Sequence, residues 1–339
     1  MKDRLEEVDY LRAIACISVV LVHLTGVYLY LDTTGTVMKT FFLCINRALI
    51  FAVPAFIFIS GFVLAYNYRD KEFAFFPFIK KRTKYLLVPY FFWTCFYYVV
   101  FVSQKIYQFS LTVFLQKLFL GDMVYHLYFV LIILQFYFLF GIINWLFKRF
   151  SSHLLLAVML VINLLFMKYV HFQYVDRFFL QYLCFFVLGV YFATNYSLIK
   201  EKICYYKYGL AVGYVLMTAL IAQQYYHNIM LQNAYDVFRN NLYWLGYSLL
   251  AILFYYFLAL LILRSPYSGL KKFLYKISEG SYYIYLSHPF VLMVALKIIK
   301  YEYFPSTALN FLFTLLFVFG TILPTTFLYK TWKKSILNN

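Results

Sequence analysis

Residues 8–30 read VDYLRAIACISVVLVHLTGVYLY, and this stretch decides the fold class of the chain. It is mostly apolar and long enough to cross the hydrocarbon core of a bilayer, which takes about 20 residues. It also carries three side chains that are charged or titrate near neutral pH, those of Asp9, Arg12 and His23. Its apolar part is too long for a signal peptide and lacks a small-residue cleavage site, so we interpret it as the first membrane span.

The composition of the 339-residue chain extends this interpretation to the whole protein. Apolar residues make up 65% of the chain, aromatic residues 24% and charged residues 13%, whereas soluble domains carry about 25% charged residues. A soluble protein of this length has too little interior to bury so much Phe, Tyr, Leu and Ile. The composition therefore excludes a disordered chain, a disulfide scaffold and a cytosolic enzyme, and it predicts an integral membrane protein.

Apolar stretches of sufficient length recur along the chain and predict an all-α integral membrane protein with ten transmembrane helices. The connections are short, so residues 1–339 are predicted to form a single ten-helix membrane domain with tails at 1–7 and 331–339. The stretch 111–120, between the third and fourth spans, looks amphipathic and predicts a short interfacial helix. The ten spans are expected at 8–30, 41–68, 85–104, 125–147, 152–170, 177–196, 207–226, 241–263, 280–300 and 307–330.

The positions of the 30 Lys and Arg residues predict the orientation. With the N-terminus inside, twenty of them fall in inner tails and loops and eight in outer loops, while Arg12 and Arg47 lie within spans. Positive residues concentrate on the cytoplasmic side of membrane proteins. The net charge of +17 is therefore attributed to topology and not to nucleic-acid binding. Both termini are predicted to be cytoplasmic in a multi-pass protein of the cell membrane.

The ionisable residues of the first span are functional candidates, because charged groups are costly within a bilayer. Asp9 and Arg12 lie one turn apart and are predicted to pair. Arg12 and His23 are separated by about three turns, so both project from one face of the helix, roughly 16 Å apart along its axis. The alternative is that Arg12 only extends to the interface and that His23 only hydrogen-bonds a neighbouring helix.

The inner loop after the second span contains KKRTKY at 80–85. A basic cluster in this position either marks topology and binds anionic lipid or holds a cytoplasmic polyphosphate through charge-assisted hydrogen bonds. We therefore take Lys81, Arg82 and Lys84 as candidate ligands of a phosphate-bearing substrate.

Polar residues also gather at the ninth span and at two outer positions. Ser278 is a candidate helix cap, and His288 beside Pro289 either lines a cavity or satisfies a backbone group that the proline frees. His126, at the outer mouth of the fourth span, and Arg47, in the second span, are further candidates, each with a purely interfacial alternative. We find no zinc spacing, Gly-rich phosphate loop or nucleophile elbow, so no metal site is predicted.

Taken together, these segments resemble the membrane acyltransferase-3 family over most of the chain. Within that family, Arg4–Leu5–Glu6 and the run LQFY at 134–137 are most similar to the Gram-positive branch that includes the intercellular-adhesin polysaccharide O-succinyltransferase. The segments that carry the resemblance are DYLR at 9–12 with His23 after ten intervening residues, VPAFIFISGF at 53–62, FIKKRTKYLLVPY at 78–90, HLYF at 126–129, FFVLG at 185–189 and SYYIYLSHP at 281–289.

The chain departs from the family pattern at two positions. The family has a second arginine three residues after the one that matches Arg82, but this chain has Tyr85 there, with Lys84 beside it. A lysine offers a point charge without the planar fork of arginine, which changes how donor phosphates would be held. Tyr128 stands where the family usually has tryptophan.

The resemblance implies a membrane O-acyltransferase that moves an acetyl or succinyl group from cytoplasmic acyl-CoA to a hydroxyl of an extracytoplasmic cell-surface glycan. In that reaction His23 is either a general base or a transient acyl carrier, and Asp9 holds Arg12 in place. Donor binding is assigned to Arg82, Lys84 and Lys81. The acceptor route or the cavity wall is assigned to His126, His288, Ser281 and Arg47.

Acyl-CoA is then a co-substrate, and no tightly bound cofactor is expected. The predicted partners are acyl-CoA, a cell-surface polysaccharide or other glycan, and membrane lipid, with no nucleic acid. Two alternatives remain. A glycan exporter or flippase would perform no covalent chemistry and would need no thioester, and a non-catalytic scaffold for a polysaccharide synthase would need neither His23 nor Arg82.

Overall fold

The computed structural model describes residues 5–231 and 236–338. The first four residues of the predicted tail 1–7, including Arg4 of the Gram-positive motif, lie outside the described residues. The same holds for Asn339 at the end of the predicted tail 331–339. The cytoplasmic location of both tails stays a prediction.

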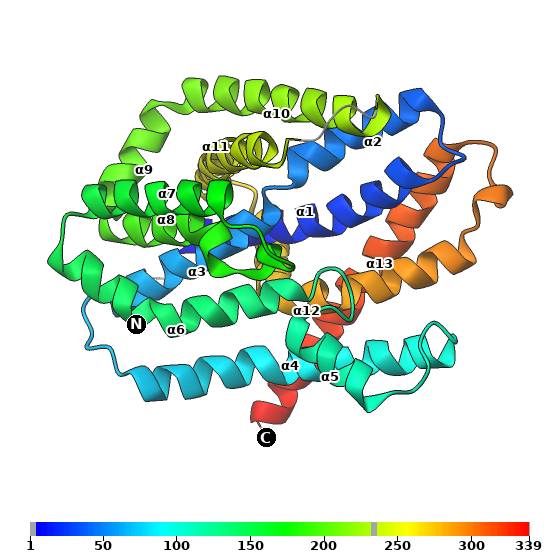
Figure 1. Cartoon of the computed structure of the whole chain (residues 1–339), viewed down its shortest axis with the longest axis horizontal. Coiled ribbons are helices and arrows are strands. Elements are labelled where there is room, and N and C mark those ends of the chain that lie inside the picture. The colour runs from blue at the N-terminus through cyan, green and yellow to red at the C-terminus, as the bar shows by residue number, and fades with distance from the viewer. Residues whose placement is uncertain (1–4, 232–235, 339) are drawn as a thin grey trace. The chain divides into compact units, whose positions relative to one another are not determined.

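Throughout the described residues the protein is helical and contains no β-strand, which confirms the all-α fold class (Figure 1). Short 3-10 segments lie at η1 (Val175–Arg177), η2 (Phe179–Tyr182) and η3 (Tyr301–Tyr303). The α-helices are α1 (Glu6–Tyr30), α2 (Thr36–Leu49), α3 (Ala52–Tyr68), α4 (Phe75–Ser103), α5 (Leu111–Leu120), α6 (Tyr128–Arg149), α7 (Ser152–Tyr169), α8 (Leu183–Thr194), α9 (Tyr196–Tyr205), α10 (Lys207–Met230), α11 (Val237–Arg264), α12 (Ser268–Ile298) and α13 (Thr307–Asn338).

Seven of these helical segments, with α2 and α3 taken together, are long and apolar enough to cross a membrane. An eighth is added if the bent pair Phe179–Thr194 and Tyr196–Tyr205 counts as one span. The protein is therefore a multi-pass membrane protein. Two further predicted spans coincide with α10 and α12, of 24 and 31 residues, but tyrosines, amides and charged residues lower their hydropathy. The count of ten and the orientation stay predictions.

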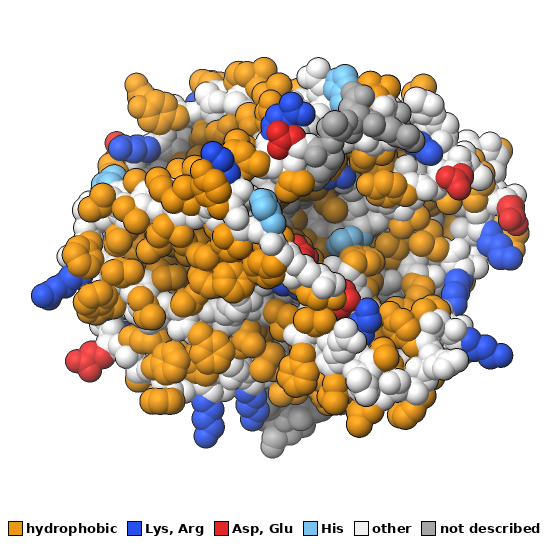
Figure 2. Space-filling model, in the orientation of Figure 1, with side chains coloured by type: hydrophobic (Ala, Val, Ile, Leu, Met, Phe, Trp, Pro, Cys, Tyr) orange, Lys and Arg blue, Asp and Glu red, His pale blue; other side chains and the backbone are white. Residues whose placement is uncertain are grey.

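Hydrophobic side chains cover most of the face shown in Figure 2, as expected for a protein whose solvent is lipid. Large apolar residues are widely exposed, among them Phe76 at 82%, Phe119 at 74% and Val215 at 63%. A soluble protein exposes such side chains singly and not in broad continuous areas.

The chain divides into two compact units, and the first comprises Met1–Ala55 and Lys202–Asn339. In this unit α1 packs against α2, α11 and α12, while α10 packs against α2 and α11, and α13 against α12. Leu11, Ala13, Ala15 and Leu24 of α1 are fully buried. A helix that is covered on several sides can carry polar groups, because they face protein and not lipid.

The second unit comprises Phe56–Glu201. Here α8 packs against α6 and α7, and α4 packs against α6. Phe136 of α6 stacks on Phe186 of α8, with ring centroids 4.3 Å apart and an interplanar angle of 3°. Both rings are fully buried, so this pair lies in the core of the unit.

Two glycines bring α3 and α8 together in the second unit. A Cβ atom on Gly61 would collide with the backbone of Phe186, and one on Gly189 would collide with the backbone of Phe58. Small residues allow membrane helices to approach closely enough for backbone contact. The ISGF and FFVLG segments, which are far apart in sequence, therefore form one tight helix crossing.

The breaks between helices have local causes. Pro54 lies in the first turn of α3, where the missing N–H costs no helical hydrogen bond. The bend of 104° between α8 and α9 falls at Asn195. The amide of Asn195 donates to Tyr191 O and to Ser152 Oγ, both at 3.1 Å, which ties the bend to the start of α7.

Two predicted boundaries are wrong, and one short helix is confirmed. Helix α4 begins at Phe75, so the KKRTKY segment is helical and does not form a loop. Helix α12 begins at Ser268, so Ser278 lies inside it and does not cap it. In both cases a run of basic residues near the start of the helix interrupts the hydropathy signal. Residues Leu111–Leu120 form the predicted short helix, α5, which starts with a hydrogen bond from the backbone N–H of Val113 to Ser110 Oγ at 3.4 Å. Its location in the interface stays a prediction.

Candidate active site

Asp9 and Arg12 form the predicted ion pair, and α12 completes it. Arg12 Nη1 lies 2.9 Å from Asp9 Oδ1. The same nitrogen donates to Ser278 Oγ at 3.3 Å, and the Ser278 hydroxyl donates to Asp9 Oδ1 at 2.9 Å. Only 26% of the Arg12 side chain and 12% of the Asp9 side chain are exposed. The three groups form a closed triangle that fixes the guanidinium at the α1–α12 contact.

His23 projects toward α12 as well. Its ring stacks on that of His288, with centroids 5.2 Å apart and an interplanar angle of 26°. His288 is buried, at 1% exposed, whereas His23 is half-buried. Arg12 and His23 thus contact the same neighbouring helix, as their predicted position on one helical face requires.

The ring of His288 is held by the backbone of its own helix. His288 Nδ1 lies 2.8 Å from Tyr285 O and 3.2 Å from Ile284 O. In a regular helix the N–H of residue 289 would bond Tyr285 O, but Pro289 has no N–H. Carbonyl oxygens only accept, so Nδ1 carries the proton and, in the neutral ring, Nε2 carries the lone pair. The histidine therefore satisfies the carbonyl that the proline frees.

The turn of α1 that carries His23 is fixed by polar contacts that sequence reasoning missed. The amide of Asn46 on α2 donates to Val22 O at 2.7 Å and to Thr25 Oγ1 at 3.0 Å. The Thr25 hydroxyl donates to Leu21 O at 2.7 Å. Asn46 is 4% exposed. The available signal was an amide inside an apolar span, which is costly unless it is hydrogen-bonded.

Ser281 lies between the Ser278 and His288 levels of α12. It is buried, and its backbone carbonyl accepts from Cys16 Sγ of α1 at 3.9 Å. The neighbouring Gly280 brings α13 close, because a Cβ there would collide with the side chain of Thr326. The predicted cavity residue Ser281 is therefore part of the packed α1–α12 contact.

Arg47 of α2 points toward α10. Its guanidinium carbon lies 3.7 Å from the centroid of the Tyr225 ring. Such cation–π contacts hold an arginine over an aromatic face and strengthen where water is excluded. Arg47 is half-buried, in the same unit as His23.

The candidate donor-binding residues belong to the second unit, in the first turns of α4. Lys81 and Lys84 are exposed, whereas Arg82 is half-buried. The Arg82 guanidinium carbon lies 5.9 Å from the centroid of the Phe78 ring, one turn earlier on the helix. The cluster therefore offers two exposed lysines and one arginine whose side chain lies partly along its own helix.

His126 also belongs to the second unit, in the turn before α6. It is 3% exposed and packs edge-on against Tyr97 and Tyr125, at centroid distances of 6.2 and 5.7 Å. The imidazole is thus enclosed by aromatic side chains.

An ionic cluster that sequence reasoning did not identify lies close to α5. Asp122 Oδ2 is 2.9 Å from Lys117 Nζ, and Asp122 Oδ1 is 2.9 Å from Arg177 Nη2. Arg177 also donates to Leu120 O. Partial burial raises the pKa of Asp122, but the hydrogen bonds from Lys117 and Arg177 outweigh it, so the pKa lies below its ordinary value. The cluster ties the end of α5 to η1.

Gln135, within the LQFY run, joins this region to α6. Its amide nitrogen donates to Arg177 O at 2.8 Å, and its amide oxygen accepts from Phe179 N at 3.1 Å. Both halves of the amide are therefore used to hold η1 and η2 against α6. The sequence contained a signal here, since Gln135 interrupts an apolar span.

Comparison with known proteins gives a family and two kinds of relative. The acyltransferase-domain profile of the acyltransferase-3 family matches residues 5–330. A putative membrane-bound acyltransferase of Bacillus subtilis is 32% identical over 178 residues, which cover 49% of this chain and 46% of that protein, so the match spans about half of each. No solved structure is significantly similar to the chain.

The second kind of relative comes from Staphylococcus aureus. Probable poly-β-1,6-N-acetyl-D-glucosamine export proteins of several strains are 27% identical, and in strain MSSA476 the match covers 86% of this chain and 83% of that protein. Because the acyltransferase-3 profile spans nearly the whole chain, this multi-pass membrane protein belongs to the acyltransferase-3 family.

Proposed function

We propose that the protein is an O-acyltransferase that moves an acetyl or succinyl group from cytoplasmic acyl-CoA to a hydroxyl of an extracytoplasmic glycan. The observation that carries the proposal is the contact between α1 and α12. It presents a half-buried imidazole, His23, stacked on His288, and a guanidinium, Arg12, fixed by Asp9 and Ser278. An imidazole and a fixed cation on one helical face suit acyl transfer, which needs a proton acceptor and stabilisation of negative charge.

In one route His23 acts as a general base. Its unprotonated ring nitrogen takes the proton from the sugar hydroxyl as that oxygen attacks the thioester carbonyl. The C–S bond then breaks, the CoA thiolate leaves, and the proton passes from His23 to the sulfur. The products are the sugar ester and free CoA, so no other reactant is needed.

In the other route His23 carries the acyl group. Its unprotonated nitrogen attacks the thioester carbonyl, the C–S bond breaks, and an acyl-imidazole forms as CoA leaves. The sugar hydroxyl then attacks the acyl carbon, its proton is lost to water, and the imidazole is regenerated. The stack on His288 suits either route, because it restricts the orientation of the His23 ring.

The donor and the acceptor are assigned by chemistry. Lys81, Arg82 and Lys84 are the candidate ligands of the CoA phosphates, because Lys and Arg form charge-assisted hydrogen bonds with phosphate. A succinyl group would add a carboxylate, for which Arg47 is a candidate partner. His126, Ser281 and His288 stay candidates for the acceptor route or the cavity wall.

Glycan export without covalent chemistry is the second candidate. The Staphylococcus aureus relatives are named as probable exporters of poly-β-1,6-N-acetyl-D-glucosamine, which supports this function for a chain that matches most of their length. An exporter consumes no thioester and does not depend on a base at position 23.

The deciding experiment follows acyl-CoA consumption by the purified protein in lipid. Radiolabelled acetyl-CoA and succinyl-CoA are supplied with cell-wall glycan, for the wild type and for His23→Asn, with His171→Asn as control. His171 is exposed, and its Nε2 lies 3.0 Å from the carbonyl oxygen of Lys168, within its own loop. We expect His23→Asn to lower turnover by about 10²–10⁴-fold and His171→Asn to leave it unchanged.

Label retained on the wild-type protein would favour the acyl-imidazole route, and the preferred donor would identify the acyl group. If the wild type consumes neither CoA in the presence of glycan, export becomes the better explanation of the family relationship.

A further inference from the structure

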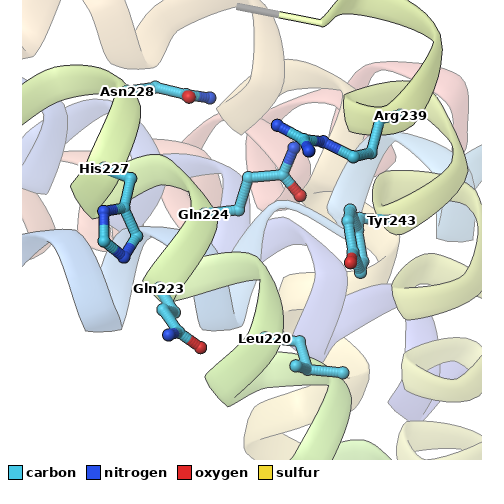
Figure 3. A pocket seen from close by; sticks show the side chains of 7 residues that line it. All are labelled: Leu220, Gln223, Gln224, His227, Asn228, Arg239 and Tyr243. Atoms are coloured by element: carbon cyan, nitrogen blue, oxygen red, sulfur yellow. The ribbon is translucent and has the colours of Figure 1, made fainter. Parts of the chain in front are cut away.

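A polar pocket of about 310 Å³ lies between α10 and α11 of the first unit, where these two helices pack together. Figure 3 shows Gln224 and Arg239 reaching toward one another from the two helices. The side chains that line the pocket are those of Leu220, Gln223, Gln224, His227, Asn228, Arg239 and Tyr243. Six of these seven can form hydrogen bonds, in a chain that is 65% apolar.

The pocket is braced from behind by Asn240, which is 3% exposed. Its amide oxygen accepts from Gln224 Nε2 and, at 3.4 Å, from Asn228 Nδ2. This leaves Gln224 Oε1 as a buried atom without a hydrogen-bond partner among the described residues. An unpaired buried acceptor is costly, so a ligand that donates a hydrogen bond at this wall would be favoured.

The start of α11 forms the second side of the pocket. Asp236 caps α11 by accepting from the backbone N–H of Arg239 at 3.0 Å. Arg239 and Tyr243 then follow one turn apart on the helix and line the pocket together. The guanidinium supplies several donors, and the phenol ring supplies an apolar face with a polar edge.

This set of groups matches a neutral sugar. Three primary amides (Gln223, Gln224 and Asn228) each offer a donor and an acceptor, as neighbouring sugar hydroxyls do. No Asp or Glu is among the seven described lining residues, which disfavours a cation. The volume is at the small end of the range for ligand pockets, about 300–1,000 Å³, which suits one sugar ring and not a nucleotide.

We infer that the α10–α11 pocket binds one sugar residue of the glycan substrate, with the amides and Arg239 on its hydroxyl or acetamido groups and Tyr243 against its ring. The inference rests on the proposed function in taking a glycan as the substrate. It goes further in assigning the recognition of that glycan to residues separate from His23.

Binding, and not turnover, tests this inference. The probe is a tetrasaccharide of β-1,6-linked N-acetyl-D-glucosamine, the sugar in the name of the Staphylococcus aureus relatives, added to the protein in nanodiscs. Its affinity is compared for the wild type, Gln223→Leu, Asn228→Leu and Tyr243→Ala. Asn241→Leu is the matched control, because this amide lies on α11, two residues before Tyr243, and does not line the pocket. A β-1,6-linked glucose tetrasaccharide and inorganic phosphate are the comparison ligands.

We expect each pocket variant to weaken tetrasaccharide binding by about tenfold or more, as for the loss of one good hydrogen bond. Asn241→Leu should bind as the wild type does. Thermal unfolding of each variant establishes that it is folded, and Gln223 is exposed, so its substitution is well tolerated.

The outcomes separate this inference from the proposed function. Unchanged affinity in all three folded pocket variants overturns the sugar site, whatever the enzyme does. Phosphate that competes with the tetrasaccharide, or binds in its place, also overturns it, by making the pocket an anion site. Binding that depends on the pocket in a protein that consumes no acyl-CoA retains the sugar site and defeats the acyl-transfer proposal.

Discussion

At the scale of single residues, His288 contacts both the backbone of its own helix and the ring of His23. Its Nδ1 is engaged by the carbonyls of Tyr285 and Ile284, and its ring face stacks on His23. The backbone contact fixes the plane of the ring, and the stack passes that constraint to His23. In the proposed reaction His288 is therefore a positioning residue.

We expect His288→Phe to lower kcat without a matching change in the KM for acyl-CoA. Phenylalanine keeps a ring for stacking but cannot satisfy Tyr285 O, so the ring is no longer held in one plane. Steady-state acyl transfer at varied donor concentration measures both constants. If His288 acts through His23, the double variant with His23→Asn should be no slower than His23→Asn alone.

A purely structural role for His288 predicts a different result. The single variant would then show a lower unfolding temperature, with the specific activity of the folded fraction unchanged. An additive loss in the double variant would likewise contradict positioning through His23.

The sequence predicted one side of this arrangement and not the other. The spacing of Asp9, Arg12 and His23 within one helix was enough to predict the ion pair and the shared face, because helix geometry is fixed. Their partners, Ser278 and His288, lie on a helix more than two hundred residues later. Which helix would pack on α1, and at which level, depends on packing that no local pattern encodes.

At the scale of elements, Gly61 and Gly189 allow the backbones of α3 and α8 to touch where the two helices cross. We expect Gly61→Ala and Gly189→Ala each to destabilise the protein by about 1–3 kcal/mol or more, because the added methyl meets backbone atoms that cannot turn aside. Thermal unfolding in detergent measures the effect. The matched control is Gly320→Ala in α13, where a Cβ would meet nothing within 4 Å.

In the control we expect no loss, or a gain of about 0.5–1 kcal/mol from the better helix propensity of alanine. Equal stability of Gly61→Ala and Gly320→Ala would show that α3 and α8 do not touch through their backbones.

The ionic cluster that joins α5 to η1 predicts a dependence on acid. The pKa of Asp122 lies below its ordinary value of 3.8, so the carboxylate adds stability above the unfolded-state pKa and loses it as the pH falls through the folded-state value. We expect the unfolding temperature to drop in this acidic range, and Asp122→Asn to remove part of that drop. The side chain is 31% exposed, so the contribution should not exceed about 1 kcal/mol.

The control for this pH series is Asp70→Asn, which removes an ion pair of comparable length, Arg69 Nε to Asp70 Oδ2 at 2.9 Å, on a side chain that is 72% exposed. Its acid profile should follow that of the wild type. If the acid profile of Asp122→Asn also matches that of the wild type, the ionic cluster does not contribute to the stability of the protein in acid.

Element boundaries were the weakest sequence inference. Hydropathy marks the long apolar part of a helix, but the signal is interrupted where basic residues lie near the helix start, as at 80–84 in α4 and at Lys271 and Lys272 in α12. It therefore missed the start of α4 at Phe75 and of α12 at Ser268. The short helix α5 was easier, because Ser110 before it and Gly121 after it are ordinary start and stop signals, with Gly121 at a φ of 63°.

At the scale of the whole molecule, the number of membrane crossings depends on α10 and α12. If both cross, as the charge distribution predicts, the two ends of each helix lie on opposite sides of the membrane. We expect cysteines placed at Leu231 and Glu302 to react with a membrane-impermeant maleimide in intact cells. Cysteines at Tyr205 and Lys272 should react only after permeabilisation. All four residues are exposed, and the five native cysteines are first replaced by alanine.

Labelling of both ends of α10, or of both ends of α12, in intact cells would reduce the number of crossings and remove the basis of the predicted orientation. Composition alone was sufficient to predict a membrane protein, since a chain with 65% apolar residues has no aqueous alternative. It could not predict which polar helices cross, because tyrosine and amide side chains suit both a packed bundle interior and an interface.

The proline beside His288 has a consequence of its own. With alanine at position 289, the restored N–H would compete for Tyr285 O, and the imidazole proton would be free to move between its two nitrogens. The ¹⁵N chemical shifts of the ring would report that exchange. A residue best known for bending helices thus fixes the tautomer of the imidazole beside it, through two adjacent positions of one helix.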